Sequence, residues 1–208
     1  MFQFIIASNN EGKIKEFRAM LGDLGRVMSQ REANIRLEPE ENAQSFEENA
    51  LKKAKAIFNT LPREPYGTFI LADDSGICVD VLGGEPGVRS ARYASKNDKN
   101  ATDEANRYKL IQELRSHGVP SSPARFVACV ALVGMGARGE RIEFVARGEC
   151  EGRVIDEERG KNGFGYDRLF IPDGLEETLA EVAPEIKNRL SHRYKALLQV
   201  RAHLAALM

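Results

Sequence analysis

Short apolar runs recur along the chain, separated by polar segments rich in glycine and charged residues. Runs of this length without helical spacing predict buried β-strands. Two of them stand close together and flank a polar interruption at residues 73–76. The predicted strands are Phe2–Ala7, Thr68–Ala72, Ile77–Leu82, Arg125–Val133 and Arg141–Arg147, the last two forming a hairpin across residues 134–139.

Between these runs, apolar residues recur three and four positions apart, which predicts amphipathic helices. Ser45 and Glu48 form an S-x-x-E capping box, so a helix is predicted to begin just after Ser45. Another helix, Asn100–His117, is expected to turn Tyr108 and Leu110–Leu114 inward. The other predicted helices are Gly12–Leu24, with Ile14, Phe17 and Leu21 on its apolar face, and a C-terminal helix marked by Tyr194, Leu197, Leu198 and Leu204.

Strands interspersed with helices predict a mixed α/β fold in which helices flank a mixed β-sheet. A length of 208 residues favours a single domain with room for two lobes. No apolar stretch approaches the ~18 residues of a membrane span, and the N-terminus carries no basic leader. The chain is therefore expected to be cytoplasmic and to have no membrane partner.

Charge and cysteine content narrow the function further. The net charge is −1, from 30 Lys+Arg against 31 Asp+Glu, which argues against a broad nucleic-acid-binding surface. Any anion site must therefore be local. Cys78, Cys129 and Cys150 stand singly in apolar runs, so we expect buried thiols of a reducing compartment rather than disulfides or a zinc site.

The polar loop Ser8–Lys13, after the first predicted strand, is a candidate anion site. Backbone N–H groups and the dipole of the following helix both point at such a loop, and Lys13 adds a positive charge. The loop is not a Walker A motif, because Ile14 stands where that motif places Ser or Thr. An ordinary strand-to-helix turn would explain the same residues.

Two carboxylates, Asp73 and Asp74, follow the second predicted strand. Acids at the carboxyl end of a strand lie where ligands and metals bind in α/β sheets. Because neighbouring strand residues point to opposite faces, only one of the two is expected to enter a given site. Glu41 adds a hard oxygen ligand of the kind that Mg²⁺ prefers. A solvated turn and a solvated acidic loop are the alternative interpretations.

Basic and aromatic residues complete the set of candidates. Lys53 lies at the edge of an apolar helix face, where it either meets an anion or extends to solvent. The glycine-rich segment 160–167 carries two aromatic rings, which either stack on a nucleobase or fill a core. His192 and Arg193 are cations at the unfavourable end of a helix dipole, which favours an acceptor-rich partner nearby.

These features favour metal-assisted phosphate chemistry on a nucleotide. Histidine is scarce, with three in the chain, and no nucleophile–base pair is recognisable, so covalent catalysis by serine or cysteine is poorly supported. A non-catalytic nucleotide- or RNA-binding module is an alternative of a different class. The near-zero net charge and the pair of Asp73 and Asp74 count against it.

Several motifs follow one another in order between residues 8 and 193. They are Ser8-Asn9-Asn10-Glu11-Gly12-Lys13, Ser45–Ala50 with Lys53-Ala54, Leu71–Gly76, Gly83–Tyr93, Gly163-Phe164-Gly165-Tyr166-Asp167 and Lys187–Arg193. In these motifs the chain resembles the inosine/xanthosine triphosphate pyrophosphatases, which remove deaminated purine nucleotides. The resemblance covers nearly the whole chain. It departs at Arg168, where the family usually has Pro, and this leaves the rigidity of that loop open.

The resemblance implies a homodimer with a two-lobed fold, a long curved mixed sheet and a nucleotide-binding groove between the lobes. It implies that ITP, dITP and XTP are hydrolysed to the monophosphate and pyrophosphate. Asp74 would be the general base, and Glu41 and Asp74 would lie near Mg²⁺. The triphosphate would meet Ser8–Lys13 and Lys53, and the nucleoside end would meet Ser75, Phe164, Gly165, Tyr166, Asp167, Lys187, His192 and Arg193.

A mechanism follows as a hypothesis. Asp74, as a carboxylate of ordinary pKa, would take a proton from the attacking water, so an alkaline pH optimum is expected. Donors from Lys187, His192 and Arg193 would form hydrogen bonds with the O6 acceptor of hypoxanthine and xanthine. With adenine, the same donors would face an amino donor. The exclusion of GTP stays open. A related pyrophosphatase acting on pyrimidine or modified nucleotides is the nearest alternative.

Overall fold

The computed structural model describes residues 2–61, 66–97, 99–136 and 139–207 of the chain. Strands and helices alternate along most of this length. The strands are β1 (Phe2–Ile6), β2 (Gly25–Ser29), β3 (Thr68–Val79), β4 (Ser121–Met135), β5 (Arg141–Ile155) and β6 (Phe170–Pro172). The helices are α1 (Glu11–Leu21), α2 (Phe46–Phe58), α3 (Asp103–Ser116), α4 (Pro184–Leu190) and α5 (His192–Ala205), with 3₁₀ turns at Asp80–Leu82 and Gly87–Arg92.

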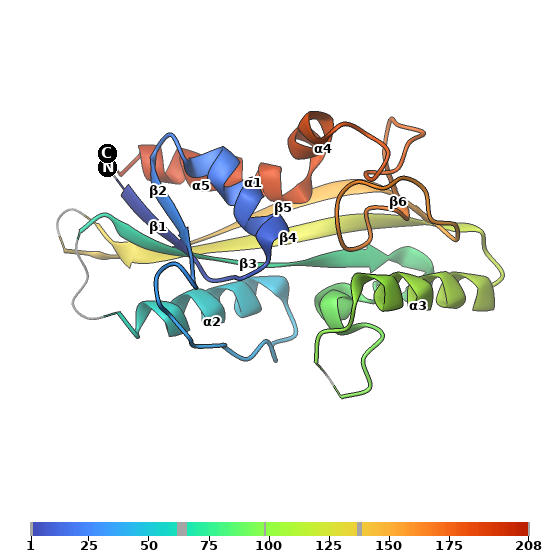
Figure 1. The fold of residues 1–208 in the computed structure, drawn as a ribbon, viewed down its shortest axis with the longest axis horizontal. Coiled ribbons are helices and arrows are strands. Elements are labelled where there is room, and N and C mark those ends of the chain that lie inside the picture. The colour runs from blue at the N-terminus through green and yellow to red at the C-terminus, as the bar shows by residue number, and fades with distance from the viewer. Residues whose placement is uncertain (1, 62–65, 98, 137–138, 208) are drawn as a thin grey trace. The chain divides into compact units, whose positions relative to one another are not determined.

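The strands form a six-stranded sheet of order β2-β1-β3-β4-β5-β6, with helices packed along it (Figure 1). Strand β1 pairs in parallel with both β2 and β3, whereas β6 pairs antiparallel with β5. The sheet is therefore mixed, and the predicted α/β (mixed) class is confirmed. None of the helices in the described ranges is long and apolar enough to cross a membrane.

Side-chain caps determine where the helices begin. Ser45 accepts a hydrogen bond from the backbone N–H of Glu48, so α2 begins at the residue that the capping box predicted. Asn10 caps α1 in the same way, through the N–H of Lys13, and α1 therefore begins at Glu11. Each cap satisfies a backbone donor that the helix itself leaves without a partner.

Strand β3 is continuous, and the predicted break at residues 73–76 was wrong. Asp, Ser and Gly are uncommon in strands, which is why the sequence pattern indicated an interruption. Burial and the neighbouring strand β4 override that preference here. Gly76 also permits a close approach, because a Cβ at this position would lie 2.4 Å from both the Gly87 carbonyl oxygen and Ser90 Oγ.

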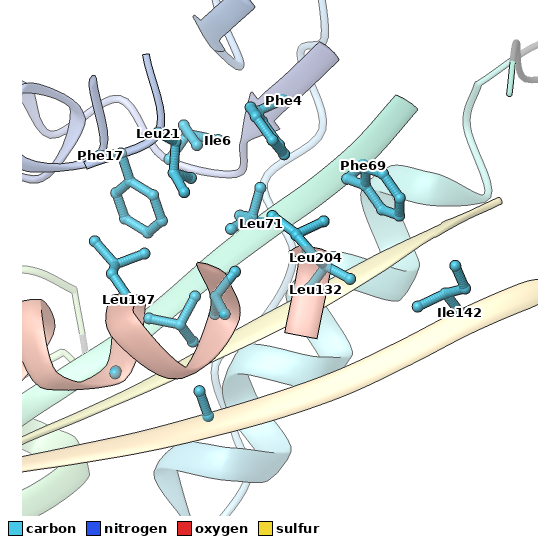
Figure 2. Close-up of a cluster of buried hydrophobic side chains, with 14 residues drawn as sticks. Phe4, Ile6, Phe17, Leu21, Phe69, Leu71, Leu132, Ile142, Leu197 and Leu204 are labelled. Carbon is cyan, nitrogen blue, oxygen red and sulfur yellow. The ribbon is translucent and has the colours of Figure 1, made fainter. Parts of the chain in front are cut away.

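The chain divides into two compact units. One falls within residues 1–74, 128–148 and 193–208, and the other within residues 75–127 and 149–192. The core of the first unit joins strand and helix side chains into one apolar cluster (Figure 2). Its labelled members are Phe4, Ile6, Phe17, Leu21, Phe69, Leu71, Leu132, Ile142, Leu197 and Leu204.

The second unit has its own core, built around helix α3. Leu110 and Leu114 are buried against apolar strand residues such as Ile77 and Phe126. The prediction that Tyr108 points inward was wrong, because its side chain is 65% exposed. Arg107, one residue earlier, is buried instead. A buried arginine needs acceptors, and helical periodicity alone does not reveal them.

Two smaller expectations concern single side chains. All three cysteines are buried and none forms a disulfide, which confirms the prediction of buried thiols. On α5, Leu197 and Leu204 are buried as predicted, but Leu198 is 45% exposed because it follows Leu197 directly and faces away from the core.

Candidate active site

The polar site of the first unit begins where β1 leaves the sheet. Ile6 is the last residue of β1 and is paired with Leu71 of β3. The chain then turns through the polar loop into α1, while β3 continues for several residues beyond Leu71. Asp73 and Asp74 therefore lie just past the carboxyl end of β1, next to the loop. This is the position in a parallel sheet where ligands commonly bind.

Strand alternation sends the two acids to opposite faces of β3. Asp73 shares a face with Phe69 and Leu71, whose side chains pack in the core under α1 and α5. Asp74 points to the other face, which α2 covers (Figure 1). The two acids therefore enter different environments, as their contacts, described next, show.

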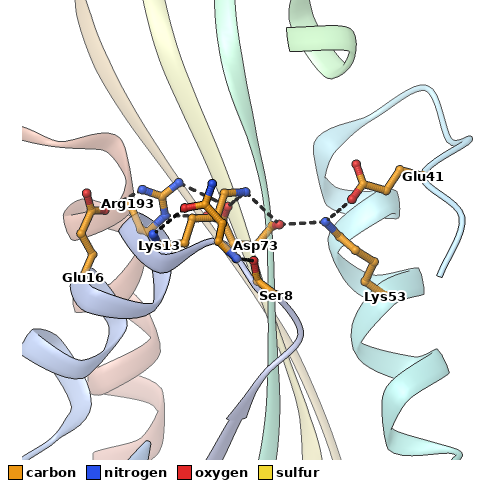
Figure 3. A network of polar contacts seen from close by, with 8 residues as sticks. Ser8, Lys13, Glu16, Glu41, Lys53, Asp73 and Arg193 are labelled. Atoms are coloured by element: carbon orange, nitrogen blue, oxygen red, sulfur yellow. Dashed lines mark hydrogen bonds and ion pairs between the residues drawn. The ribbon is translucent and has the colours of Figure 1, made fainter. Parts of the chain in front are cut away.

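Asp73 is the anion of a buried ion-pair network (Figure 3). Lys13 Nζ lies 2.5 Å from Asp73 Oδ1, and Arg193 Nε donates to Asp73 Oδ2 at 2.9 Å. Arg193 also reaches Glu16 Oε2 at 2.5 Å. Burial alone would raise the pKa of Asp73, but the charges of Arg193 and Lys13 outweigh it and hold the pKa well below its usual range. These two cations therefore favour the ionised form of Asp73.

Asp74 lies in a different environment. Its Oδ2 atom is buried and has no hydrogen-bond partner among the described residues. Burial raises the pKa of Asp74 to about 6, with the positive charge of Lys53 opposing the rise and the negative charge of Glu41 adding to it. The assumption of an ordinary pKa for this carboxylate was therefore wrong. A pKa near the working pH suits a general base.

Lys53 connects the two environments from helix α2. Its side chain is buried, and Nζ donates to Glu41 Oε1 at 2.7 Å and to the backbone carbonyl oxygen of Asp73 at 3.0 Å. The sequence left open whether Lys53 meets an anion or extends to solvent, and in the structure it meets Glu41. Figure 3 shows Lys53 and Glu41 on one side of β3 and Lys13 and Arg193 on the other.

The loop before α1 presents polar groups beside this network. Ser8 Oγ accepts a hydrogen bond from the backbone N–H of Asn10 at 3.1 Å. Asn9, Asn10 and Glu11 are exposed, whereas Ser8, Gly12 and Lys13 are half-buried. The loop therefore combines exposed polar side chains with a helix start and a cation, which are the components of an anion site.

The remaining predicted residues belong to the second unit, and most of them form a separate cluster. Asp167 Oδ2 accepts from Lys187 Nζ at 2.7 Å and from the backbone N–H of Phe164 at 2.8 Å. Lys187 Nζ lies 4.6 Å from the centre of the Phe164 ring.

The other predicted residues of this unit have contacts of their own. The Tyr166 hydroxyl donates to the carbonyl oxygen of Ser90, and Tyr166 is buried. Ser75 lies in β3, and the ring of His192 stacks on Phe126 with centroids 4.8 Å apart.

Sequence reasoning missed two residues of the first-unit site. Glu16 lies one helical turn after Lys13 on α1 and holds Arg193. Asn49 is fully buried on α2, and its side chain lowers the pKa of Asp74. A polar residue on the apolar face of a helix was the available signal for Asn49, because Phe46 and Lys53 share that face with it.

Known proteins are similar to this chain over almost its whole length. The profile of the Ham1 family matches residues 4–203. The chain belongs to the Ham1 family. It is 45% identical to the dITP/XTP pyrophosphatase of Campylobacter jejuni, covering 94% of this chain and 93% of that protein. It is 44% identical to that of Sulfurimonas denitrificans, with 94% of each chain covered.

Solved Ham1 structures share the fold. A HAM1 protein from Coxiella burnetii superposes with a TM-score of 0.81 at 35% identity, covering 99% of this chain and all of that chain. The Ham1 protein of Staphylococcus aureus gives a TM-score of 0.79 at 36% identity, with 98% of each chain covered.

Pyrophosphatases of the Ham1 family generally depend on a divalent metal, and two carboxylates of this chain fit one. Asp74 carries a buried oxygen that finds no hydrogen-bond partner in the described ranges, and Glu41 lies close enough for its charge to raise the pKa of Asp74. The described part of the chain contains no group of three or more His, Cys, Asp or Glu side chains arranged for a metal. A site with few protein ligands, completed by phosphates and water, is the type that suits Mg²⁺.

Proposed function

We propose that this chain hydrolyses the non-canonical purine nucleoside triphosphates dITP, ITP and XTP to the monophosphate and pyrophosphate. The proposal is supported by the family, by the names of its curated relatives, and by one observation above all. Two neighbouring carboxylates lie on opposite faces of β3, one held ionised by Lys13 and Arg193, the other buried with a raised pKa. Such a divergence separates a charge-organising acid from a proton-accepting one.

In the proposed reaction, Asp74 takes a proton from a water molecule that attacks the α-phosphorus. The new P–O bond forms as the bond to the bridging oxygen of the β-phosphate breaks, and pyrophosphate leaves. Lys13, Lys53 and the loop Ser8–Lys13 offset the charge of the β- and γ-phosphates. Asp73 orients Lys13 and Arg193, because it accepts from both.

Mg²⁺ is the metal that we propose for Glu41 and Asp74, which offer hard carboxylate oxygens. When bound, it would draw negative charge from the leaving pyrophosphate. Lys53 now pairs with Glu41, so this lysine would exchange its partner for a phosphate when Glu41 turns to a metal. The lysine and the metal thus compete for one carboxylate.

The nucleoside end is assigned to residues of the second unit: Ser75, Phe164, Gly165, Tyr166, Asp167, Lys187 and His192. The Phe164 ring offers a stacking surface, and Lys187 offers donors to the purine O6. Arg193 was expected to join them, but its side chain is 2% exposed and donates to Asp73 and Glu16. We therefore assign Arg193 to the support of Asp73.

Two further assignments accompany this function. We propose a homodimer, as the resemblance implies, which sedimentation analysis would test. We also propose a cytoplasmic location, because the nucleoside triphosphates that the reaction consumes are used there.

The decisive experiment measures pyrophosphate released from ITP, dITP and XTP with Mg²⁺, and repeats the assay with EDTA. We expect metal-dependent release of one pyrophosphate and one monophosphate per triphosphate. A nucleotide-binding module would bind ITP and release nothing. Equal rates with ATP or GTP would contradict the proposed selectivity, and a preference for pyrimidine triphosphates would favour the related pyrophosphatase instead.

A further inference from the structure

In the second unit, one turn of helix α3 binds both backbone hydrogen-bonding groups of Gly165, a residue of the glycine-rich loop Gly163–Asp167. The backbone N–H of Gly165 donates to Asp103 Oδ2 at 2.7 Å, and its carbonyl oxygen accepts from Arg107 Nη1 at 3.0 Å. Asp103 and Arg107 are four residues apart on α3, so they lie on the same helix face. Both backbone hydrogen-bonding groups of Gly165 are thereby fixed to α3.

Arg107 also connects to the segments before and after the loop. It is buried, and its Nε donates to Glu158 Oε1 at 2.8 Å. Glu158 in turn accepts from Arg168 Nη1 at 3.2 Å. Arg168 stands where the resemblance led us to expect Pro, and its guanidinium is bound to Glu158. The two ion pairs, Arg107 with Glu158 and Glu158 with Arg168, therefore restrain the residue that follows the loop. A proline ring at position 168 would have restrained the same backbone.

Gly165 depends on such external contacts because of its backbone. Its φ is +60°, in the left-handed region that favours glycine. A Cβ at this position would meet open space, so glycine is required here by the backbone angle and not by close packing. Since glycine loses the most conformational freedom on folding, its order has to be supplied by hydrogen bonds to neighbouring elements.

The residue next to Gly165 carries the chemistry of the loop. Phe164 donates its backbone N–H to Asp167 and offers its ring to the Lys187 ammonium group. Lys187 is paired with the same carboxylate oxygen of Asp167. A shift of Gly165 would move Phe164 and disturb both of these contacts together.

We propose that Asp103 and Arg107 are positioning residues that set the nucleobase selectivity of the loop Gly163–Asp167. The inference rests on the proposed function, in which this loop meets the nucleoside end of the substrate. Asp103 and Arg107 act through the backbone of Gly165 and not by contact with the base.

Asp103 offers a matched pair of variants. Asp103→Asn keeps an oxygen that accepts the Gly165 N–H, whereas Asp103→Ala removes it. Both variants remove the same negative charge from the first turn of α3, so any loss from the helix dipole is common to them. Glu104→Ala, an exposed acid in the same turn, controls for the loss of a side chain there.

For Asp103→Ala we expect the KM for ITP to rise roughly three- to tenfold, the size of effect that the loss of one ordinary hydrogen bond produces. We expect kcat to stay near the parent value and the preference for ITP over ATP to fall. Asp103→Asn and Glu104→Ala should resemble the parent. Identical KM and selectivity in Asp103→Ala and Asp103→Asn would overturn the proposal, as would a loss confined to kcat.

A second readout does not depend on activity. Amide hydrogen exchange at Gly165 should be faster in Asp103→Ala than in the parent and unchanged in Asp103→Asn. If the parent chain releases no pyrophosphate from ITP, the proposed function fails, and the exchange comparison alone decides the positioning role. Equal exchange in the two variants would then overturn it. Arg107→Lys keeps the charge but loses the planar fork, and should raise KM in the same direction.

Discussion

Asp73 and Asp74 are adjacent in β3 and lie on its opposite faces, and their pKa values are shifted in opposite directions. On the face covered by α1 and α5, Asp73 meets Lys13 and Arg193, and its pKa falls well below the usual range. On the face covered by α2, Asp74 has a buried oxygen without a described partner, and its pKa rises to about 6. Both side chains are buried, so burial by itself does not separate them.

The difference shows that direct contact with cations decides the role of a buried carboxylate. Desolvation disfavours the charged form of both acids. Two cations in direct contact reverse that effect for Asp73. For Asp74, the charges of Lys53, which is itself paired with Glu41, and of Lys13 only reduce the effect. Asp73 is thereby suited to hold cations in place, and Asp74 to accept a proton or bind a metal.

The largest effect is expected from Asp74→Asn. Turnover of ITP should fall roughly 10²–10⁴-fold, because an amide accepts no proton from water. ITP should still bind, since the phosphate-binding lysines are untouched. Rapid-quench turnover and equilibrium titration with ITP measure the two quantities. Near-normal turnover in this variant would remove Asp74 from the mechanism and end the contrast between the two faces.

Asp73→Asn tests the other face. The variant leaves buried Arg193 and half-buried Lys13 without the carboxylate of Asp73, which should cost about 3–5 kcal/mol of unfolding free energy. Urea denaturation followed by circular dichroism measures the loss. The matched control is Glu176→Gln, which breaks the exposed pair with Arg153 and should cost about 0–1 kcal/mol. Equal losses in the two variants would show that the buried network is not structural.

The same substitution at Asp74 should raise the unfolding free energy instead of lowering it. Its pKa is raised in the folded state, so its contribution to stability is full below the unfolded pKa and is lost as the pH rises through about 6. Asp74→Asn should therefore stabilise the metal-free protein by about 1–3 kcal/mol at about pH 7. The gain should shrink towards about pH 4. Thermal unfolding across this range checks it, and a destabilised variant would contradict the raised pKa.

The smallest effect should come from the neighbours Lys52 and Lys53. Lys53→Met removes the larger of the two lysine charges that lower the pKa of Asp74, so the acidic limb of the pH–rate profile should move up by about one pH unit. Lys52 is exposed and donates to Asn42, so Lys52→Met should leave the profile in place. Profiles of kcat/KM for both variants make the comparison. An unmoved limb in Lys53→Met would separate that lysine from Asp74.

The sequence by itself determined the local features of the protein. The hydroxyl of Ser45 and its spacing to Glu48 placed the start of α2, because capping involves only neighbouring residues. The two-residue period of a strand predicted that Asp73 and Asp74 would lie on opposite faces. The order of apolar runs and helically spaced segments predicted the mixed α/β class, because strands and helices repeat their apolar residues with different periods.

Tertiary structure decided which charges meet. Asp73 and Arg193 are 120 residues apart in the chain, and only the packing of α5 against β3 joins them. Burial and the neighbouring strand β4 made β3 continuous through Asp73 and Asp74, although their intrinsic preference is for turns. Arg107 is buried in place of Tyr108 because its acceptors, Glu158 and Gly165, come from a distant segment. Pairing energies between remote residues leave no periodic trace in a sequence.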